Sequence, residues 1–369
     1  MPRNSLILQT RRRSPPATGV RRVVHVVLAT LLLLAVIETA LQVRSHFRTG
    51  DSVINLLFAE TRYVEDAQTG LTVLRPNRVF VSNKVVLRTN SLGLRSPEIP
   101  LARSPGSWRL AVVGASTVMG AYDPDTEQTF PARLEQRLRR EFPERRVEVV
   151  NAGIVGYKLT DQRRMLETRI AELHPDLVIL YPGFNDFLDY CQEPATPGRP
   201  RHQGLPLVSL PSWLLSVDML KKNTVSLRTP PVRPSSMRNP ETIDLLPYRA
   251  RLEAIIGRAS QLGLPLVLAT NARAYRRDQS LEEQMKLSET DRYYNHCFDL
   301  EGLHVLYDRH NAEIRAAGAA HGIPVVPLDE LIPGGGRYFA DSHHFSVEAE
   351  GMVADALSAF ITRNKLLPE

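Results

Sequence analysis

The amino-acid sequence predicts an α/β fold: a mainly parallel, five-stranded sheet with helices on both faces, preceded by one N-terminal transmembrane helix. Three observations lead to this prediction: the hydrophobic content, the alternation of two kinds of segment, and one long apolar run. Hydrophobic residues make up 43% of the 369 residues. That share is enough for a packed core and argues against global disorder.

Short apolar runs rich in β-branched residues alternate with longer helix-like stretches from about residue 109 onward. The predicted strands are 109–114, 147–151, 176–181, 265–269 and 324–328. The predicted helices are 126–141, 159–173, 248–262, 301–321 and 346–364. Such alternation is typical of a parallel sheet with right-handed crossovers and a helical layer on each face. Ligands bind such sheets beyond the carboxyl ends of the strands.

The long apolar run covers residues 23–43, which is enough to cross a bilayer as a helix. Six arginines precede it and two follow it. The positive-inside rule therefore keeps residues 1–22 in the cytoplasm as a basic tail and exports the rest of the chain. A cleaved signal peptide ending at Ala40 is the alternative, although Glu38 then stands where cleavage prefers a small residue. We expect an uncleaved signal anchor in the cytoplasmic membrane, with the folded domain periplasmic or extracellular.

The positive charge of the chain belongs to this N-terminus. The net charge is +6, while eight arginines and Glu38 give residues 1–48 a charge of +7, so the other 321 residues sum to −1. A nucleic-acid-binding domain presents a basic face, and this balance gives it no support. Cys191 and Cys297 are too few for a disulfide framework, and the sequence leaves open whether they pair or stay free.

Three segments lie outside the alternation. Residues 44–106 are predicted to be an N-terminal extension of short strands and turns, which extends the sheet or forms a cap. Residues 189–247 carry ten of the 27 prolines, a density that breaks regular structure. This insertion is either a lid over the site or a loop on the surface away from it. A polar insertion, 273–300, has a helix-like middle, and the domain as a whole is expected to span 107–366.

Chemically competent residues follow three of the predicted strands and precede the last helix. Ser116 follows the first strand, Gly153 the second and Asn185 the third. Asp341 and His344 lie just before the last helix. Because the carboxyl ends of parallel strands meet at one edge of a sheet, we expect these residues to converge.

This combination of residue types fits acyl transfer through a serine. Ser116 is predicted to attack as nucleophile, His344 to act as base, and Asp341 to orient that histidine. The N–H groups of Ser116 and Gly153 and the Asn185 amide are predicted to form the oxyanion hole.

Each of these residues also has a plainer interpretation. Ser116 fits a capped strand-to-helix turn, and Gly153 and Asn185 fit ordinary turn positions. The Asp-Ser-His-His segment at 341–344 fits a helix N-cap or half of a metal site. Since no other cysteine or histidine pair has the spacing of zinc ligands, we predict neither a metal nor a cofactor.

The four motifs together resemble the SGNH hydrolases, also called GDSL-type esterases and lipases. That family is named for a serine, a glycine, an asparagine and a histidine in four separate blocks. Here they fall, in the same chain order, on Ser116, Gly153, Asn185 and His344. The resemblance covers about residues 107–366, and the combination of four blocks is more specific than any one of them.

Two blocks agree with the family pattern in detail, and one departs from it. Residues 183–186 resemble the family's Gly-x-Asn-Asp. Residues 341–344 resemble its Asp-x-x-His, a spacing that selects His344 rather than His343 as the base. The first block has Ala115 where the name motif has aspartate. That aspartate is not part of the family's triad, so we expect activity to survive.

The resemblance implies a flavodoxin-like, three-layer α/β/α sandwich and a serine esterase or acylhydrolase. The membrane anchor and the proline-rich insertion are similar to those of family members that act on cell-envelope glycans. The expected substrate is an O-acyl ester, including O-acetyl, on an envelope carbohydrate or lipid. Two alternatives remain: an O-acyltransferase acting on an extracytoplasmic glycan, and a non-catalytic protein that binds glycans or scaffolds an envelope complex.

Overall fold

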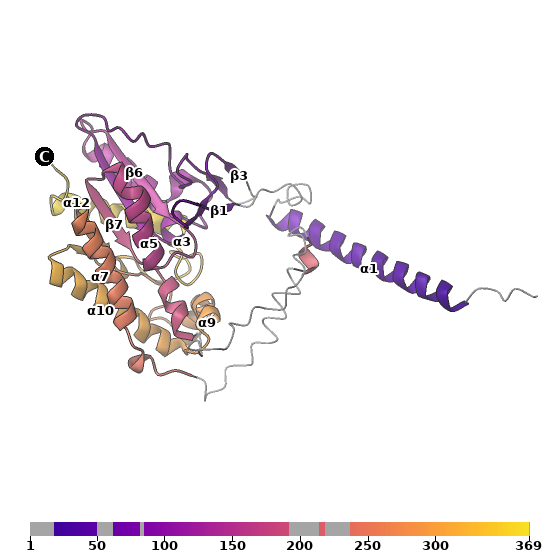
Figure 1. Cartoon of the computed structure of the whole chain (residues 1–369). Coiled ribbons are helices and arrows are strands. Elements are labelled where there is room, and N and C mark those ends of the chain that lie inside the picture. Colours follow the sequence, from indigo (N-terminus) through magenta and orange to yellow (C-terminus); the bar gives the residue numbers. More distant parts are fainter. Residues whose placement is uncertain (1–17, 50–61, 82–84, 192–213, 218–236, 369) are drawn as a thin grey trace, which may run out of the picture. The chain divides into compact units, whose positions relative to one another are not determined.

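The computed structural model describes residues 18–49, 62–81, 85–191, 214–217 and 237–368. The chain divides into two compact units. One unit comprises Met1–Ala59 and Gly204–Arg228 and contains the helix α1 (Thr18–Thr49). The other comprises Glu60–Gln203 and Thr229–Glu369 and contains the central sheet (Figure 1).

Helix α1 contains one segment, Arg21–Arg44, that is long and apolar enough to cross a membrane. The apolar side chains of this segment are exposed, and its length and composition suit a membrane anchor or a signal sequence. Glu38 accepts hydrogen bonds from the backbone N–H groups of Leu215 and Ser216, at 2.9 and 3.0 Å. Those two residues belong to the proline-rich insertion, of which 192–213 and 218–236 lie outside the described residues.

The central sheet has five strands, all parallel, in the order β6-β5-β7-β8-β9. Their bounds are β5 Trp108–Gly114, β6 Val147–Gly153, β7 Leu177–Tyr181, β8 Leu266–Ala269 and β9 Val325–Val326. The predicted parallel sheet is confirmed. The last strand is shorter than predicted because Pro324 and Pro327 flank it, and proline has no N–H to donate to a sheet.

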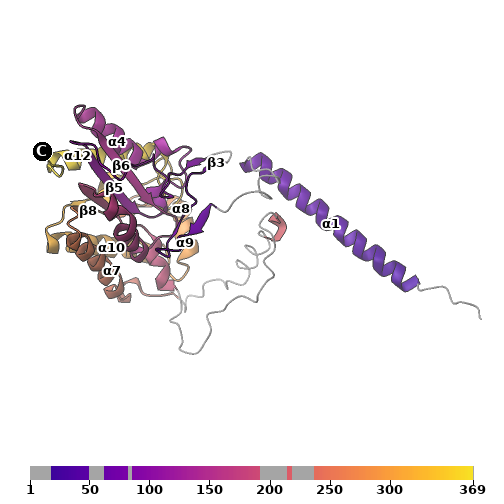
Figure 2. The ribbon, with the colours of Figure 1, turned by 45° about the horizontal axis from the view of Figure 1, so that its top comes forward.

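Helices cover both faces of this sheet, as predicted. Figure 2 shows α4 (Phe130–Glu141) and α12 (Val347–Arg363) on one side, with α7 (Leu246–Gln261) and α10 (Leu300–His321) on the other. Helix α5 (Leu159–Met165) packs against α7. The side chains of β5 alternate between the two cores. Leu110 and Val112 pack with α4 and α12, while Ala111 and Val113 pack with α5 and α7.

Two predicted helices are interrupted in the structure. The stretch 126–141 is a 3₁₀ turn, η1 (Thr126–Gln128), followed by α4, because Thr129 between them has extended backbone angles. The stretch 159–173 is α5 followed by one π-helical and one 3₁₀ turn. The shorter elements near the site are α3 (Ser116–Met119), η4 (Asn185–Cys191), α8 (Leu281–Leu287), α9 (Glu289–Tyr294) and α11 (Leu328–Leu331).

The short strands expected before the sheet form two separate antiparallel hairpins. They are β1 (Tyr63–Glu65) with β2 (Thr72–Leu74), and β3 (Val79–Val81) with β4 (Val86–Arg88). Neither hairpin joins the five-stranded sheet. Buried leucines and valines of this region, including Leu71 and Leu87, pack into the same core as α5. The hairpins therefore cover part of one core.

The carboxyl ends of β5 and β6 are held close to α3 by two glycines. Gly114 and Gly153 are direct neighbours across the sheet. A Cβ atom on Gly114 would lie 2.3 Å from Val118 Cγ2 and 2.8 Å from the Tyr181 carbonyl oxygen. One on Gly153 would lie 2.2 Å from the Met119 nitrogen. Only glycine at these two positions lets α3 begin directly on the strand ends.

We predict that Gly114→Ala destabilises the domain by about 1–3 kcal/mol, because buried atoms must move to admit the methyl group. The matched control is Gly257→Ala on α7, where an added Cβ meets nothing within 4 Å. That variant should be as stable as the wild type or more stable by about 0.5–1 kcal/mol. Guanidinium unfolding of the full-length protein in non-ionic detergent, followed by tryptophan fluorescence, measures both. Equal stability of the two variants would contradict the close packing of α3.

Candidate active site

Ser116 is the first residue of α3 and lies at the edge of the sheet where β5 ends. Its side chain is nearly buried, with 8% of the residue exposed. Its Oγ atom lies 2.8 Å from His344 Nε2. The predicted nucleophile therefore sits within hydrogen-bond reach of the predicted base.

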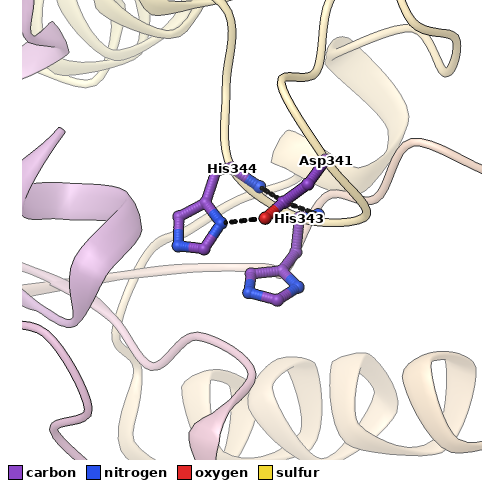
Figure 3. A group of neighbouring side chains, drawn as sticks. All are labelled: Asp341, His343 and His344. Carbon is purple, nitrogen blue, oxygen red and sulfur yellow. Dashed lines mark hydrogen bonds and ion pairs between the residues drawn. The ribbon is translucent and has the colours of Figure 1, made fainter. Parts of the chain in front are cut away.

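His344 comes from the loop before α12, and Asp341 lies on the same loop. The loop is closed by a bridge between Phe339 and Phe345 and by the Ala340 N–H donating to the His344 carbonyl. Asp341 Oδ2 lies 2.8 Å from His344 Nδ1, and Asp341 Oδ1 accepts the backbone N–H groups of His343 and His344 at 3.0 and 2.9 Å. Figure 3 shows these contacts and the two imidazole rings beside each other. The Asp341 carboxylate thus stabilises the turn at 341–344 and also orients the His344 ring.

The ionisation of these groups favours proton transfer from the serine. Burial raises the pKa of the Asp341 carboxyl, but the hydrogen bond from His344 and the charge of His343 outweigh it and hold that pKa well below its usual range. Burial, followed by the nearby charge of His343, lowers the pKa of His344 below its usual value. His344 is therefore neutral near pH 7 and able to accept a proton.

Asp341, His343 and His344 are also close enough together to bind a metal ion, because one potential ligand atom from each lies within 4.8 Å of the others. Hydrogen bonds already occupy these groups. Both Asp341 oxygens accept bonds from the loop, and His344 bridges Asp341 and Ser116. His343 Nδ1 bonds to Asp291. The arrangement fits a proton relay better than a metal centre.

The predicted oxyanion donors are only partly gathered around Ser116. Asn185 begins η4 and lines the same cavity as Ser116, while its Nδ2 donates to the Tyr157 carbonyl at 3.1 Å. The second Nδ2 hydrogen remains for another acceptor. The Gly153 N–H instead donates to Asn151 Oδ1 at 3.0 Å. The Ser116 N–H belongs to the first turn of α3, whose N–H groups have no acceptor within the helix.

The loop that carries Asn185 is tied down by its neighbour Asp186. The Asp186 side chain is fully buried, accepts the Leu159 N–H at 3.0 Å, and forms an ion pair with Arg251. These contacts join the loop to the start of α5 and to α7. The aspartate of the Gly-x-Asn-Asp block thus positions the loop and does not face the serine.

Cys191 and Cys297 form a disulfide bond, a question that the sequence left open. Their Cα atoms are 5.5 Å apart, and 106 positions separate them in the chain. The bond joins the end of η4 to the segment between α9 and α10. It therefore ties the element that begins with Asn185 to the segment that follows α9.

Ser116, Asn185 and His344 line a cavity of about 470 Å³. Tyr122 and Tyr294 also line it, and each is about half exposed. Tyr122 lies with its ring centroid 4.9 Å from that of His344. Burial, followed by the nearby negative charge of Asp341, raises the pKa of the Tyr122 hydroxyl. A larger cavity of about 730 Å³, lined by residues of α8 and the start of α10, includes none of the predicted site residues.

Two side chains of the site were missed by sequence reasoning. Tyr122 follows α3 with no motif to mark it. Asp291 lies in the polar insertion 273–300 and contacts His343, which is 52 positions further along the chain. An acidic residue in a polar stretch carries no signal of burial, so only the structure pairs these two.

The chain belongs to the GDSL-like lipase/acylhydrolase family, whose model matches residues 112–350, more than half of the chain. The match spans the serine, the asparagine and the Asp-x-x-His loop. The protein is thus a carboxylic ester hydrolase by family, in agreement with the prediction. No curated protein matches the sequence significantly.

The solved structures that match this chain include several lipolytic proteins and esterases. A putative lipolytic protein of the G-D-S-L family from Desulfitobacterium hafniense has 14% identity and a TM-score of 0.41, covering 68% of this chain and 98% of its own. A lipase/acylhydrolase from Enterococcus faecalis has 17% identity and a TM-score of 0.42, covering 70% and 96%. An acetylxylan esterase from Geobacillus stearothermophilus has 17% identity and a TM-score of 0.42, and the match covers 69% of this chain and 95% of that protein. Family membership rests on the family model rather than on these similarities.

We predict that the two neighbouring histidines titrate on opposite sides of the ordinary histidine pKa. His344 should become protonated only below it, since burial and the charge of His343 disfavour its cation. Burial also lowers the pKa of His343, but the Asp291 carboxylate outweighs this and raises it. Histidine-selective ¹³C labelling and NMR titration of the full-length protein measure both. A His344 that charges before His343 as the pH falls would contradict the geometry.

Proposed function

We propose that the protein is a serine esterase that cleaves O-acyl esters through an acyl-enzyme intermediate, with Ser116, His344 and Asp341 as its triad. One observation carries the proposal: a continuous hydrogen-bonded chain runs from Ser116 Oγ through the His344 ring to the Asp341 carboxylate, with 2.8 Å at each step. Such a chain lets the serine lose its proton as it attacks a carbonyl.

The first half-reaction forms the acyl-enzyme. Ser116 Oγ attacks the ester carbonyl carbon, and His344 Nε2 takes the hydroxyl proton. Asp341 holds the resulting imidazolium in place through Nδ1 and stabilises its charge. The tetrahedral intermediate then collapses, and His344 gives its proton to the departing alcohol oxygen. The acyl group remains on Ser116.

The second half-reaction releases the acid. Water gives a proton to His344 and attacks the acyl carbon, and the proton then returns to Ser116 as its bond to the acyl group breaks. A sugar hydroxyl in place of water would give acyl transfer through the same steps. Product analysis with and without a sugar acceptor separates the two outcomes.

The oxyanion of each tetrahedral intermediate is held by three donors in this proposal. They are the Ser116 N–H, the free hydrogen of the Asn185 amide and the Gly153 N–H. The Ser116 N–H lies at the start of α3, where the helix itself supplies no acceptor, and the bond to Tyr157 uses only one of the two Asn185 amide hydrogens. The Gly153 N–H has to leave or share its bond with Asn151 when substrate binds. Its contribution is therefore smaller than that of the other two.

The substrate in this proposal is an O-acyl group, including O-acetyl, on a carbohydrate or lipid of the cell envelope. A cavity of about 470 Å³ is of the size that takes a small-molecule group. The half-exposed rings of Tyr122 and Tyr294 offer apolar faces with polar tips at its rim. Such rings suit the mixed polar and apolar surface of a sugar.

The catalytic domain is extracytoplasmic in this proposal, with α1 as a single-pass anchor and residues 1–22 in the cytoplasm. Two observations support it. The span Arg21–Arg44 follows an arginine-rich stretch, as the positive-inside rule requires. The Cys191–Cys297 disulfide is of the kind that persists outside the reducing cytoplasm.

We predict that Ser116→Ala and His344→Ala each lower kcat for p-nitrophenyl acetate by at least about 10³-fold, because each removes a member that the others need. The full-length protein in non-ionic detergent is assayed with acetate and butyrate esters. The ratio of the two rates reports the size of the acyl pocket.

Matched substitutions on the surface serve as controls. Ser260→Ala at the end of α7 and His321→Gln at the end of α10 change the same residue types at exposed positions that do not line the cavity. Both should keep wild-type activity. If the folded site variants also kept it, the triad would be wrong, and a glycan-binding or scaffold role would take its place.

A further inference from the structure

We propose that Asp291 and His343 form a second, buried carboxylate–histidine pair that keeps a positive charge beside His344. In this role His343 is a positioning residue for the reaction. It holds His344 in the neutral form that accepts the Ser116 proton, so that activity extends into more acidic solution. The inference rests on the proposed function and adds to it a charge that the triad alone does not contain.

The pair is defined by a short contact inside the protein. Asp291 Oδ1 lies 2.6 Å from His343 Nδ1, and the Asp291 side chain is fully buried. The other carboxylate oxygen accepts the hydroxyls of Tyr275 and Tyr307, at 2.9 and 3.0 Å. With three such donors the carboxylate is well satisfied as an anion. A buried anion is costly without a cation, and His343 is the basic group in direct contact with it.

The imidazole of His343 also contacts both halves of the predicted site. Its ring centroid lies 4.3 Å from that of His344 and 4.5 Å from that of Phe184, on which it stacks at 18°. Phe184 directly precedes Asn185, the predicted oxyanion donor. His343 lines the same cavity as Ser116. A charge on this ring therefore acts on the reacting atoms at short range.

Charged and titratable groups face the two histidines from each neighbouring element. They are Asp341 on their own loop, Asp291 from α9, Tyr275 from the segment after β8, Tyr307 from α10 and Tyr122 from the segment after α3. Arg273 adds a cation 5.1 Å from the Tyr307 ring. Each carboxylate hydrogen-bonds to one imidazole ring, Asp341 to that of His344 and Asp291 to that of His343.

The electrostatic consequence follows from the order in which the rings charge. When His343 is already an imidazolium, a second cation on His344 is disfavoured by repulsion between like charges. A general base works only in its unprotonated form. Loss of the His343 charge should therefore let His344 become protonated at higher pH, and activity should fall earlier on the acid side.

The test uses His343→Gln and Asp291→Asn in the full-length protein. Glutamine removes the charge and keeps a hydrogen-bond donor, while asparagine removes the anion that keeps His343 protonated. We expect the ratio of kcat/KM at about pH 5 to that at about pH 8 to fall by about threefold or more in each variant. His321→Gln, which removes an exposed histidine paired with Glu253, should leave the ratio unchanged.

A second measurement does not depend on esterase activity. The NMR titration of His344 in His343→Gln and in Asp291→Asn should move to higher pH than in the wild type. If folded His343→Gln shows an unchanged His344 titration and an unchanged pH profile, the pair is only structural and the inference fails. Should Asp291→Asn not fold, His343→Gln decides alone. A wild type without esterase activity but with the shifted titration would refute the proposed function and leave the pair intact.

Discussion

The contact between α3 and the paired ends of β5 and β6 determines where the candidate nucleophile stands. Gly114 and Gly153 face each other across the sheet, and a methyl group on either would collide with α3 or with the neighbouring strand. Because both lack a side chain, α3 begins at once and Ser116 becomes its first residue. The strand order β6-β5-β7 then brings the Asn185 loop beside it. The paired ends of the parallel strands therefore determine the position of the serine.

Two carboxylate–histidine pairs lie next to each other at the cavity that Ser116 lines. Asp341 and His344 are adjacent on one loop, whereas Asp291 reaches His343 from a separate helix. The first pair hydrogen-bonds to the serine, and the second places a charge within ring-contact distance of the first. Neighbouring histidines with separate counter-ions divide two roles between them, since one is kept neutral and the other charged.

The fold could be predicted from the sequence, and so could the approach of Ser116, Asn185 and His344 to one cavity, because these depend on local patterns. The apolar runs gave the strands, and parallel strand ends gather Ser116 and Asn185 at one edge. Contacts between distant segments left no such pattern. The Asp291–His343 pair, the Cys191–Cys297 bond and the Gly153 N–H bonded to Asn151 all needed the structure. The break at Thr129 did leave a local marker, because a threonine followed by Pro131 is typical of the start of a new helix rather than of a helix interior.

Reaction of the full-length protein with a fluorophosphonate probe tests most directly whether Ser116 is an activated nucleophile. The probe bonds covalently to a serine whose proton is removed by a neighbouring base. Mass spectrometry of the digested protein should find one adduct, on Ser116, and the adduct should disappear in His344→Ala while Ser260→Ala keeps it. An adduct on another residue, or none on a folded protein that still hydrolyses esters, would contradict the triad.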